Sequence, residues 1–134
     1  MERMTAPQSP HTHHIGAVAE RTGLSLRTLR HYDEVGLVTP SGRSEGGFRL
    51  YTDADVERIL LVRRMKPLGF TLEEMGDLLG LASTLESNPG ADARARLDGY
   101  LASAHERREA LHNKLDMADE FIALLEQRRD GADS

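Results

Sequence analysis

At 134 residues the chain has room for one compact domain and an appendage. It contains no cysteine, which excludes disulfides and thiolate sites, and no run of the roughly 18 apolar residues that a membrane span requires. The net charge of −5 is unevenly distributed: residues 15–66 carry nine Lys and Arg against seven Asp and Glu, and residues 67–134 carry seven against fourteen. Because salt screens charges beyond about 8–10 Å, an acidic C-terminal half does not exclude nucleic-acid binding by the N-terminal half. We expect a cytoplasmic protein.

The first segment, residues 1–14, is polar and contains two prolines and three histidines. This composition predicts a disordered tail. His11, His13 and His14 could bind a metal ion, but a histidine-bearing tail without acidic or thiol companions is more often inert. We therefore predict no metal site.

Two short helices separated by a tight turn are predicted next. The first covers residues 15–22 and ends at Gly23, and the second runs from Leu26 towards Val35 after Ser25, a natural N-cap. The second helix carries three cationic or polar side chains at spacings i, i+3 and i+4, which places them on one face: Arg27, Arg30 and His31. A short arginine-bearing helix after such a turn is typical of a helix-turn-helix that enters the DNA major groove.

The period of the sequence changes after Gly36. Residues 37–40 are predicted to be extended, residues 41–47 form a polar turn, and residues 48–51 alternate, which indicates a small β-hairpin, or wing. We expect Arg43 at its tip, with Arg49 and Tyr51 on the face opposite Phe48 and Leu50. The guanidinium of Arg49 suits a phosphate, and the alternative is an ordinary surface arginine on a solvated hairpin.

A second pair of helices should follow the wing, capped by Thr52 and Thr71 and ended by Gly69 and Gly80. Basic residues at the end of the first of these helices, including Lys66, could reach backbone phosphates. Residues 81–91 contain an Asn-Pro-Gly break and are predicted to be a linker.

The last predicted element is one long helix over residues 92–129, with a disordered tail at 130–134. Its seam residues recur at alternating spacings of four and three: Leu97, Leu101, Ala104, Arg108, Leu111, Leu115, Ala118, Ile122 and Leu125. So long a helix needs a partner for its seam, most simply a second copy of the chain, although a lone helix folded back on its own domain is an alternative. Tyr100, Met117, Phe121 and Leu124 flank the seam as core residues or as the lining of a small effector pocket.

No convergent acid, base and nucleophile is evident, so we expect neither an enzyme nor a cofactor. His105 and His112 stand beside acidic residues on the long helix, but they are two turns apart and cannot share one ion within one helix. We interpret them as surface histidines.

In series, these motifs resemble the MerR family of bacterial transcription regulators. The resemblance rests on IGAVAERTGLSLRTLRHYDEVGLVTP, RSEGGFRLY, TDADV and LGFTLEEM, and it covers residues 15–80 and the long helix. It implies a mainly α-helical winged helix-turn-helix domain over residues 15–80, followed by an antiparallel coiled-coil dimerisation helix. It also implies a homodimer that binds a pseudo-palindromic promoter and distorts the DNA so that RNA polymerase can engage it.

Carried over by motif, the resemblance implies a set of DNA-binding residues: Arg27, Thr28, Arg30, His31, Tyr32, Arg43, Phe48, Arg49, Tyr51 and Lys66. Family members that sense metals or redox state use cysteines, and this chain has none. Only nine residues follow Leu125, so a large ligand domain is not expected, and a small-molecule effector near the coiled coil stays an open alternative.

Two other functions are alternatives to a MerR-type regulator. An architectural or excision-type DNA-bending protein would share the wing, but the long helix counts against it. A coiled-coil adaptor would use the helix-turn-helix to bind protein, and loss of DNA affinity without loss of dimerisation would favour it.

Overall fold

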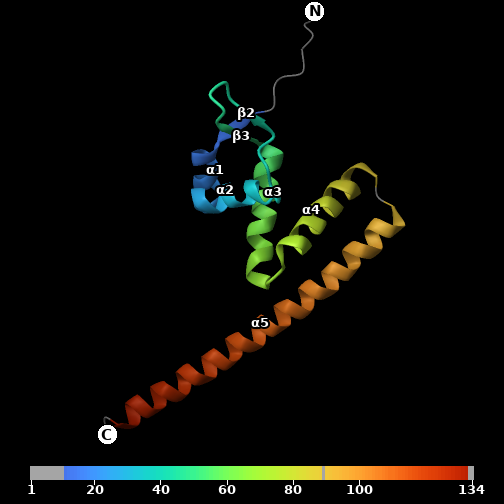
Figure 1. Cartoon of the computed structure of the whole chain (residues 1–134). Helices are drawn as coiled ribbons and strands as arrows, with labels where there is room; N and C mark the ends of the chain where they lie inside the picture. The colour runs from blue at the N-terminus through green and yellow to red at the C-terminus, as the bar shows by residue number, and fades with distance from the viewer. Residues whose placement is uncertain (1–10, 89, 133–134) are drawn as a thin grey trace, which may run out of the picture. The chain divides into compact units, whose positions relative to one another are not determined.

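The computed structural model describes residues 11–88 and 90–132. The chain is mostly helical and has a long C-terminal helix, as predicted, and it also contains a small three-stranded sheet (Figure 1). It divides after Gly80 into two compact units, which are described separately here. In the described ranges, no helix is both long enough and apolar enough to cross a bilayer.

Three helices build the core of the N-terminal unit. They are α1 (Ile15–Thr22), α2 (Leu26–Glu34) and α3 (Asp53–Met65), and α1 packs against both of the others. Each helix buries an apolar stripe, and the fully buried side chains include Val18, Leu29, Val56, Ile59 and Val62. A short 3-10 turn, η1 (Lys66–Leu68), follows α3 and ends at Gly69.

The predicted helix starts are confirmed by their hydrogen bonds. The Ser25 hydroxyl accepts from the backbone N–H of Thr28 at 3.0 Å. Thr52 and Asp55 form a reciprocal capping box at the start of α3, and Thr71 and Glu74 exchange the same pair of bonds at the start of α4 (Leu72–Ser87). Capping boxes satisfy the otherwise unpaired first N–H groups of a helix, which is why they can be read from a four-residue pattern.

The wing is a three-stranded antiparallel sheet rather than an isolated hairpin. Its strands are β1 (Thr12–His14), β2 (Gly42–Arg43) and β3 (Arg49–Thr52), in the order β1-β3-β2. The prediction of a disordered tail over residues 1–14 is therefore wrong for residues 12–14, and residues 1–10 lie outside the described part of the chain. Residues 12–14 form a strand because β3 provides the backbone hydrogen-bonding partners that an isolated tail segment lacks. In this antiparallel pair, His13 lies opposite Tyr51.

Asp55 fastens the wing to α3. Its buried carboxylate accepts hydrogen bonds from the backbone N–H and hydroxyl of Ser41, at 3.0 and 2.9 Å, and from the N–H of Thr52 at 2.9 Å. It also pairs with the Arg58 guanidinium. Burial opposes ionisation of Asp55, but these hydrogen bonds and Arg58 together outweigh it and hold the pKa of the carboxyl below its ordinary value.

Two predicted boundaries in the second half are wrong. Helix α4 (Leu72–Ser87) does not end at Gly80, and it occupies most of the segment 81–91 that was predicted to be a linker. The reason is that Gly80 keeps a negative φ and Leu81 is buried, so the helix continues until Asn88, whose neighbour Pro89 disfavours further helix. Helix α5 (Ala91–Ala132) has 42 residues, about 63 Å at 1.5 Å per residue, and includes residues predicted to belong to a disordered tail.

Candidate nucleic-acid interface

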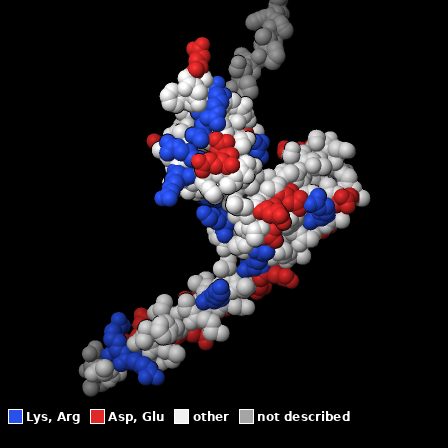
Figure 2. Space-filling view, in the orientation of Figure 1, with Lys and Arg blue, Asp and Glu red and all other residues white. Residues whose placement is uncertain are grey.

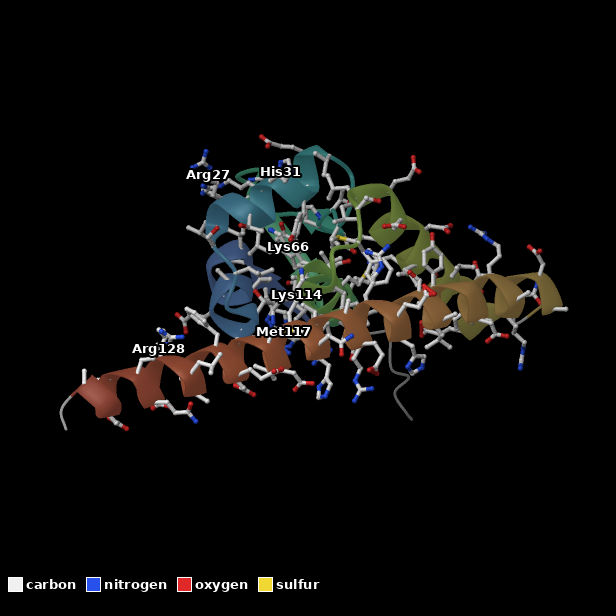
Figure 3. All side chains as sticks on the ribbon, turned by 90° about the horizontal axis from the view of Figure 1, so that it is seen from below. Arg27, His31, Lys66, Lys114, Met117 and Arg128 are labelled. Carbon is white, nitrogen blue, oxygen red and sulfur yellow. The ribbon has the colours of Figure 1, made fainter. Side chains whose placement is uncertain are left out.

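Helix α2 turns one face inward and the other outward. Leu29 and Tyr32 are buried, whereas Arg27, Arg30 and His31 are exposed. Figure 3 shows Arg27 and His31 projecting from the outer side of α2. Thr28 is half-buried, and its hydroxyl accepts a 2.9 Å hydrogen bond from that of Ser25. The predicted cationic face is therefore exposed on the outer side of α2.

The turn before α2 is held from α3. Gly23 takes a left-handed φ of 73°, a conformation that costs side-chain-bearing residues about 1–2 kcal/mol. The Arg63 guanidinium donates a 2.6 Å hydrogen bond to the carbonyl of Thr22, at the end of α1. The arginine thus satisfies one of the unpaired carbonyls at this helix end and fixes the angle at which α2 is presented.

One carboxylate of α2 gathers two arginines of the wing. Asp33 accepts a 2.8 Å hydrogen bond from Nε of Arg49 and lies 3.4 Å from Nη2 of Arg43. The hydrogen bond to Asp33 raises the pKa of Arg49, so its positive charge is secure. Two guanidinium groups and one carboxylate leave a net charge of about +1 where α2 meets the wing. Figure 2 shows Lys and Arg side chains gathered on this side of the N-terminal unit, with acidic side chains beside them.

Two tyrosines expected to hold phosphates are in the core instead. Tyr51 is 0% exposed and Tyr32 is 3% exposed. Burial raises the pKa of both phenols, and within the described residues neither hydroxyl has a hydrogen-bond partner. The alternation along β3 was predicted, but the face holding Arg49 and Tyr51 packs against the domain, and Phe48 beyond the strand is 67% exposed. The predicted outward orientation of Tyr51 is therefore wrong.

Lys66 lies at the rim of a small cavity beside α2. The cavity measures about 260 Å³ and is also lined by His31 and Tyr32 of α2 and by Phe70, Leu72 and Met75 around the start of α4. Lys66 is exposed, on the same cavity as His31 of the cationic face. Phosphate contact by Lys66 stays a prediction, as it does for Arg43, Phe48 and Arg49.

The seam of α5 is exposed along most of its length. Leu101, Leu111, Leu115, Ile122 and Leu125 are 43–58% exposed, Leu97 and Ala104 are half-buried, and Arg108 and Ala118 are exposed. Beside the seam, Met117, Phe121 and Leu124 are 55–67% exposed. An apolar stripe this long is typical of a helix surface that packs against a partner.

Comparison with known proteins settles the family. Residues 14–80 match the family described as "MerR HTH family regulatory protein", and residues 56–117 match "MerR, DNA binding". The chain belongs to the MerR family.

Individual MerR proteins resemble the chain over most of its length. The regulator CueR of Salmonella typhimurium is 37% identical over 112 residues, which are 84% of this chain and 78% of CueR. The activator mta of Bacillus subtilis is 36% identical over 110 residues, or 82% of this chain, but the match spans only 37% of mta. The chain also resembles the crystal structure of HiNmlR, a MerR family regulator lacking the sensor domain, bound to promoter DNA. The two sequences are 25% identical. The match covers 87% of this chain and 92% of HiNmlR, with a TM-score of 0.67.

Sequence reasoning missed two carboxylates of this MerR domain. Asp33 and Asp55 organise the wing, but each binds wing partners 10 to 16 residues away along the chain. No short motif encodes such distant contacts. The predicted cap at Thr52 accounts only for the local contact of Asp55 at the start of α3.

Proposed function

We propose that the protein is a sequence-specific transcription regulator of the MerR type that acts as a homodimer on pseudo-palindromic double-stranded promoter DNA. The observation that carries the proposal is the exposed cationic face of α2, presented by a MerR domain beside the arginines of the wing. Two copies joined along α5 would present two such faces, which matches the two half-sites of a palindrome.

The proposed DNA contacts divide into two classes. Arg27 and Arg30 would read base edges in the major groove, with Thr28 and His31 alongside them. Arg43, Arg49 and Lys66 would hold phosphates, and Phe48 is exposed where the wing can approach the backbone. Tyr32 and Tyr51 would support α2 and the wing from within the core.

The proposed mechanism is control of promoter shape. HiNmlR, a MerR family regulator lacking the sensor domain, was crystallised bound to promoter DNA. We infer that the dimer of this chain distorts its promoter so that RNA polymerase can engage both promoter elements, and that it works in the cytoplasm, where that DNA is. The proposal includes no cofactor and no catalysis, and the apolar residues beside the α5 seam leave room for a small-molecule effector.

Selection of bound duplexes from a random DNA pool tests the proposal without a guess about the target. The purified full chain at moderate salt should recover two inverted half-sites at fixed spacing. A matched R27A/R30A double variant, which lacks only exposed side chains, should recover nothing above background. Recovery of single half-sites would contradict the dimer, and failure of the wild-type chain to enrich any sequence would favour the adaptor function.

A further inference from the structure

Three potential metal ligands converge at the base of the wing. In the described part of the chain they form the one group of at least three His, Cys, Asp or Glu side chains whose ligand atoms come together: His11, His13 and Asp53, within 4.8 Å of one another. The rings of His11 and His13 lie 4.6 Å apart, edge to face, and Nε2 of His13 is 2.7 Å from Oδ1 of Asp53. None of the three belongs to the proposed DNA-binding face.

The pairing of β1 with β3 explains why these side chains meet. His11 and His13 are two residues apart along an extended segment, so they lie on the same face. Thr12 stands opposite Thr52 in the antiparallel register, and continuing that register by one residue brings His11 opposite Asp53, the first residue of α3. The cluster is therefore built by the sheet and not by a chance contact of exposed side chains.

We propose that His11, His13 and Asp53 form a binding site for a divalent transition-metal ion of the zinc type. Imidazole nitrogens favour Zn²⁺, Ni²⁺ and Cu²⁺ over Mg²⁺ and Ca²⁺, and two histidines with one carboxylate form a common three-ligand set. Ligand atoms around a tetrahedral zinc ion lie about 3.3 Å apart, given Zn–N distances of 2.0–2.1 Å. The exposed side chains of His11 and Asp53 can close the remaining distance by rotation.

A guanidinium now shares this site. Nη1 of Arg21 lies 3.2 Å from Nε2 of His13 and 3.5 Å from Oδ1 of Asp53. A metal ion would have to displace Arg21, whose half-exposed side chain can swing into solvent.

Occupancy would tie the start of β1 to the start of α3. His13 belongs to the edge strand β1, His11 directly precedes that strand, and Asp53 belongs to the helix that Asp55 already fastens to the wing. A bound ion would hold β1 against β3, so the ion should stabilise the folded domain by binding it and not the unfolded chain.

Isothermal titration of the full-length protein with ZnCl₂ tests the site, at a mildly alkaline pH where protons compete least for imidazole. We expect one ion per chain, and we expect H11A and D53N each to weaken binding by about tenfold or more. Both positions are exposed, so their substitution should leave the circular dichroism spectrum unchanged. His14→Ala, on the other face of β1, and His112→Ala, on α5, are matched controls that should bind like the wild type.

Arg21→Ala gives a second, independent measurement. Removal of the competing cation should tighten zinc binding several-fold, a change that a purely structural role of the cluster does not predict. Absence of zinc binding by the wild-type chain would overturn the proposal. So would zinc binding by H11A and D53N with the same affinity as the wild type. Unchanged or weaker binding by the Arg21 variant would place any zinc away from this cluster.

Discussion

Arg30 is exposed on the outer face of α2. Arg30→Ala should reduce affinity for the selected operator by about 1–3 kcal/mol, because a bidentate contact to a base edge is worth that much in discrimination. The measurement is a comparison of operator and scrambled duplexes by fluorescence anisotropy. Arg94 is an exposed arginine at the start of α5. Arg94→Ala is the control and should leave the affinity for both duplexes unchanged. An equal loss on both duplexes would remove Arg30 from base reading.

Arg49 binds Asp33 through Nε, and among the described residues its two terminal nitrogens have no protein partner. A phosphate can therefore bind Arg49 without displacing the carboxylate. Arg49→Ala should weaken binding to all duplexes and reduce the slope of log K against log salt by about one, since one fewer counterion is released. The slope is measured from titrations at several salt concentrations, and a slope identical to that of the wild type would show that Arg49 touches no phosphate.

The identity of these arginines could be predicted from sequence, but their surroundings could not. Spacings of three and four residues are enough to place Arg27 and Arg30 on one helix face. Tyr51 shows the opposite case: alternation assigns it to a face with Arg49, but which face meets the core depends on how the sheet sits on α1 and α3.

At the scale of elements, the same contrast separates helix starts from strand partners. The capping boxes at Thr52 and Thr71 are complete within four residues, so the sequence alone predicts them. The strand β1 exists only because β3, some 40 residues later, offers an edge, and a polar histidine-rich tripeptide gives no sign of this. Likewise Gly80 was an unreliable stop for α4, because a glycine ends a helix only where the backbone turns to positive φ.

Asp55 joins the polar turn, β3 and α3 through one buried carboxylate, so its substitution should affect all three. Asp55→Asn should lower the free energy of unfolding by about 3 kcal/mol at neutral pH, because an amide nitrogen would then face backbone N–H donors and Arg58 would lose its partner. Urea unfolding followed by circular dichroism measures the loss. Glu57→Gln, an exposed carboxylate two residues later, should be nearly neutral.

The pH dependence of this contribution has a definite sign. The pKa of Asp55 is lower in the folded protein than its ordinary value of 3.8, so the stabilisation is fully present above that value and is lost as pH falls below it towards the folded pKa. The difference in stability between the wild type and Asp55→Asn should therefore shrink in acid. A difference that stays constant from neutral pH to about pH 3 would contradict the role of the ionised carboxylate.

At the scale of the whole molecule, the exposed seam of α5 requires a second copy of the chain in our proposal. Leu111→Asp should weaken dimerisation by about 3 kcal/mol or more, roughly a hundredfold in the dissociation constant, because a charge would be buried against apolar side chains. Light scattering should then give the mass of a monomer. Ala110→Asp adds the same charge one position away from the seam and should stay dimeric, and a dimeric Leu111→Asp protein would refute the seam.

Because the seam on α5 and the cationic face on α2 lie in separate units of the chain, damage to one should leave the other intact. In genetic terms, this makes two kinds of allele. The Arg30→Ala subunit keeps its seam and can pair with wild-type subunits. Every mixed dimer then binds one of its two half-sites weakly, so this allele should be dominant over the wild type. The Leu111→Asp subunit cannot pair with wild-type subunits, so this allele should be recessive.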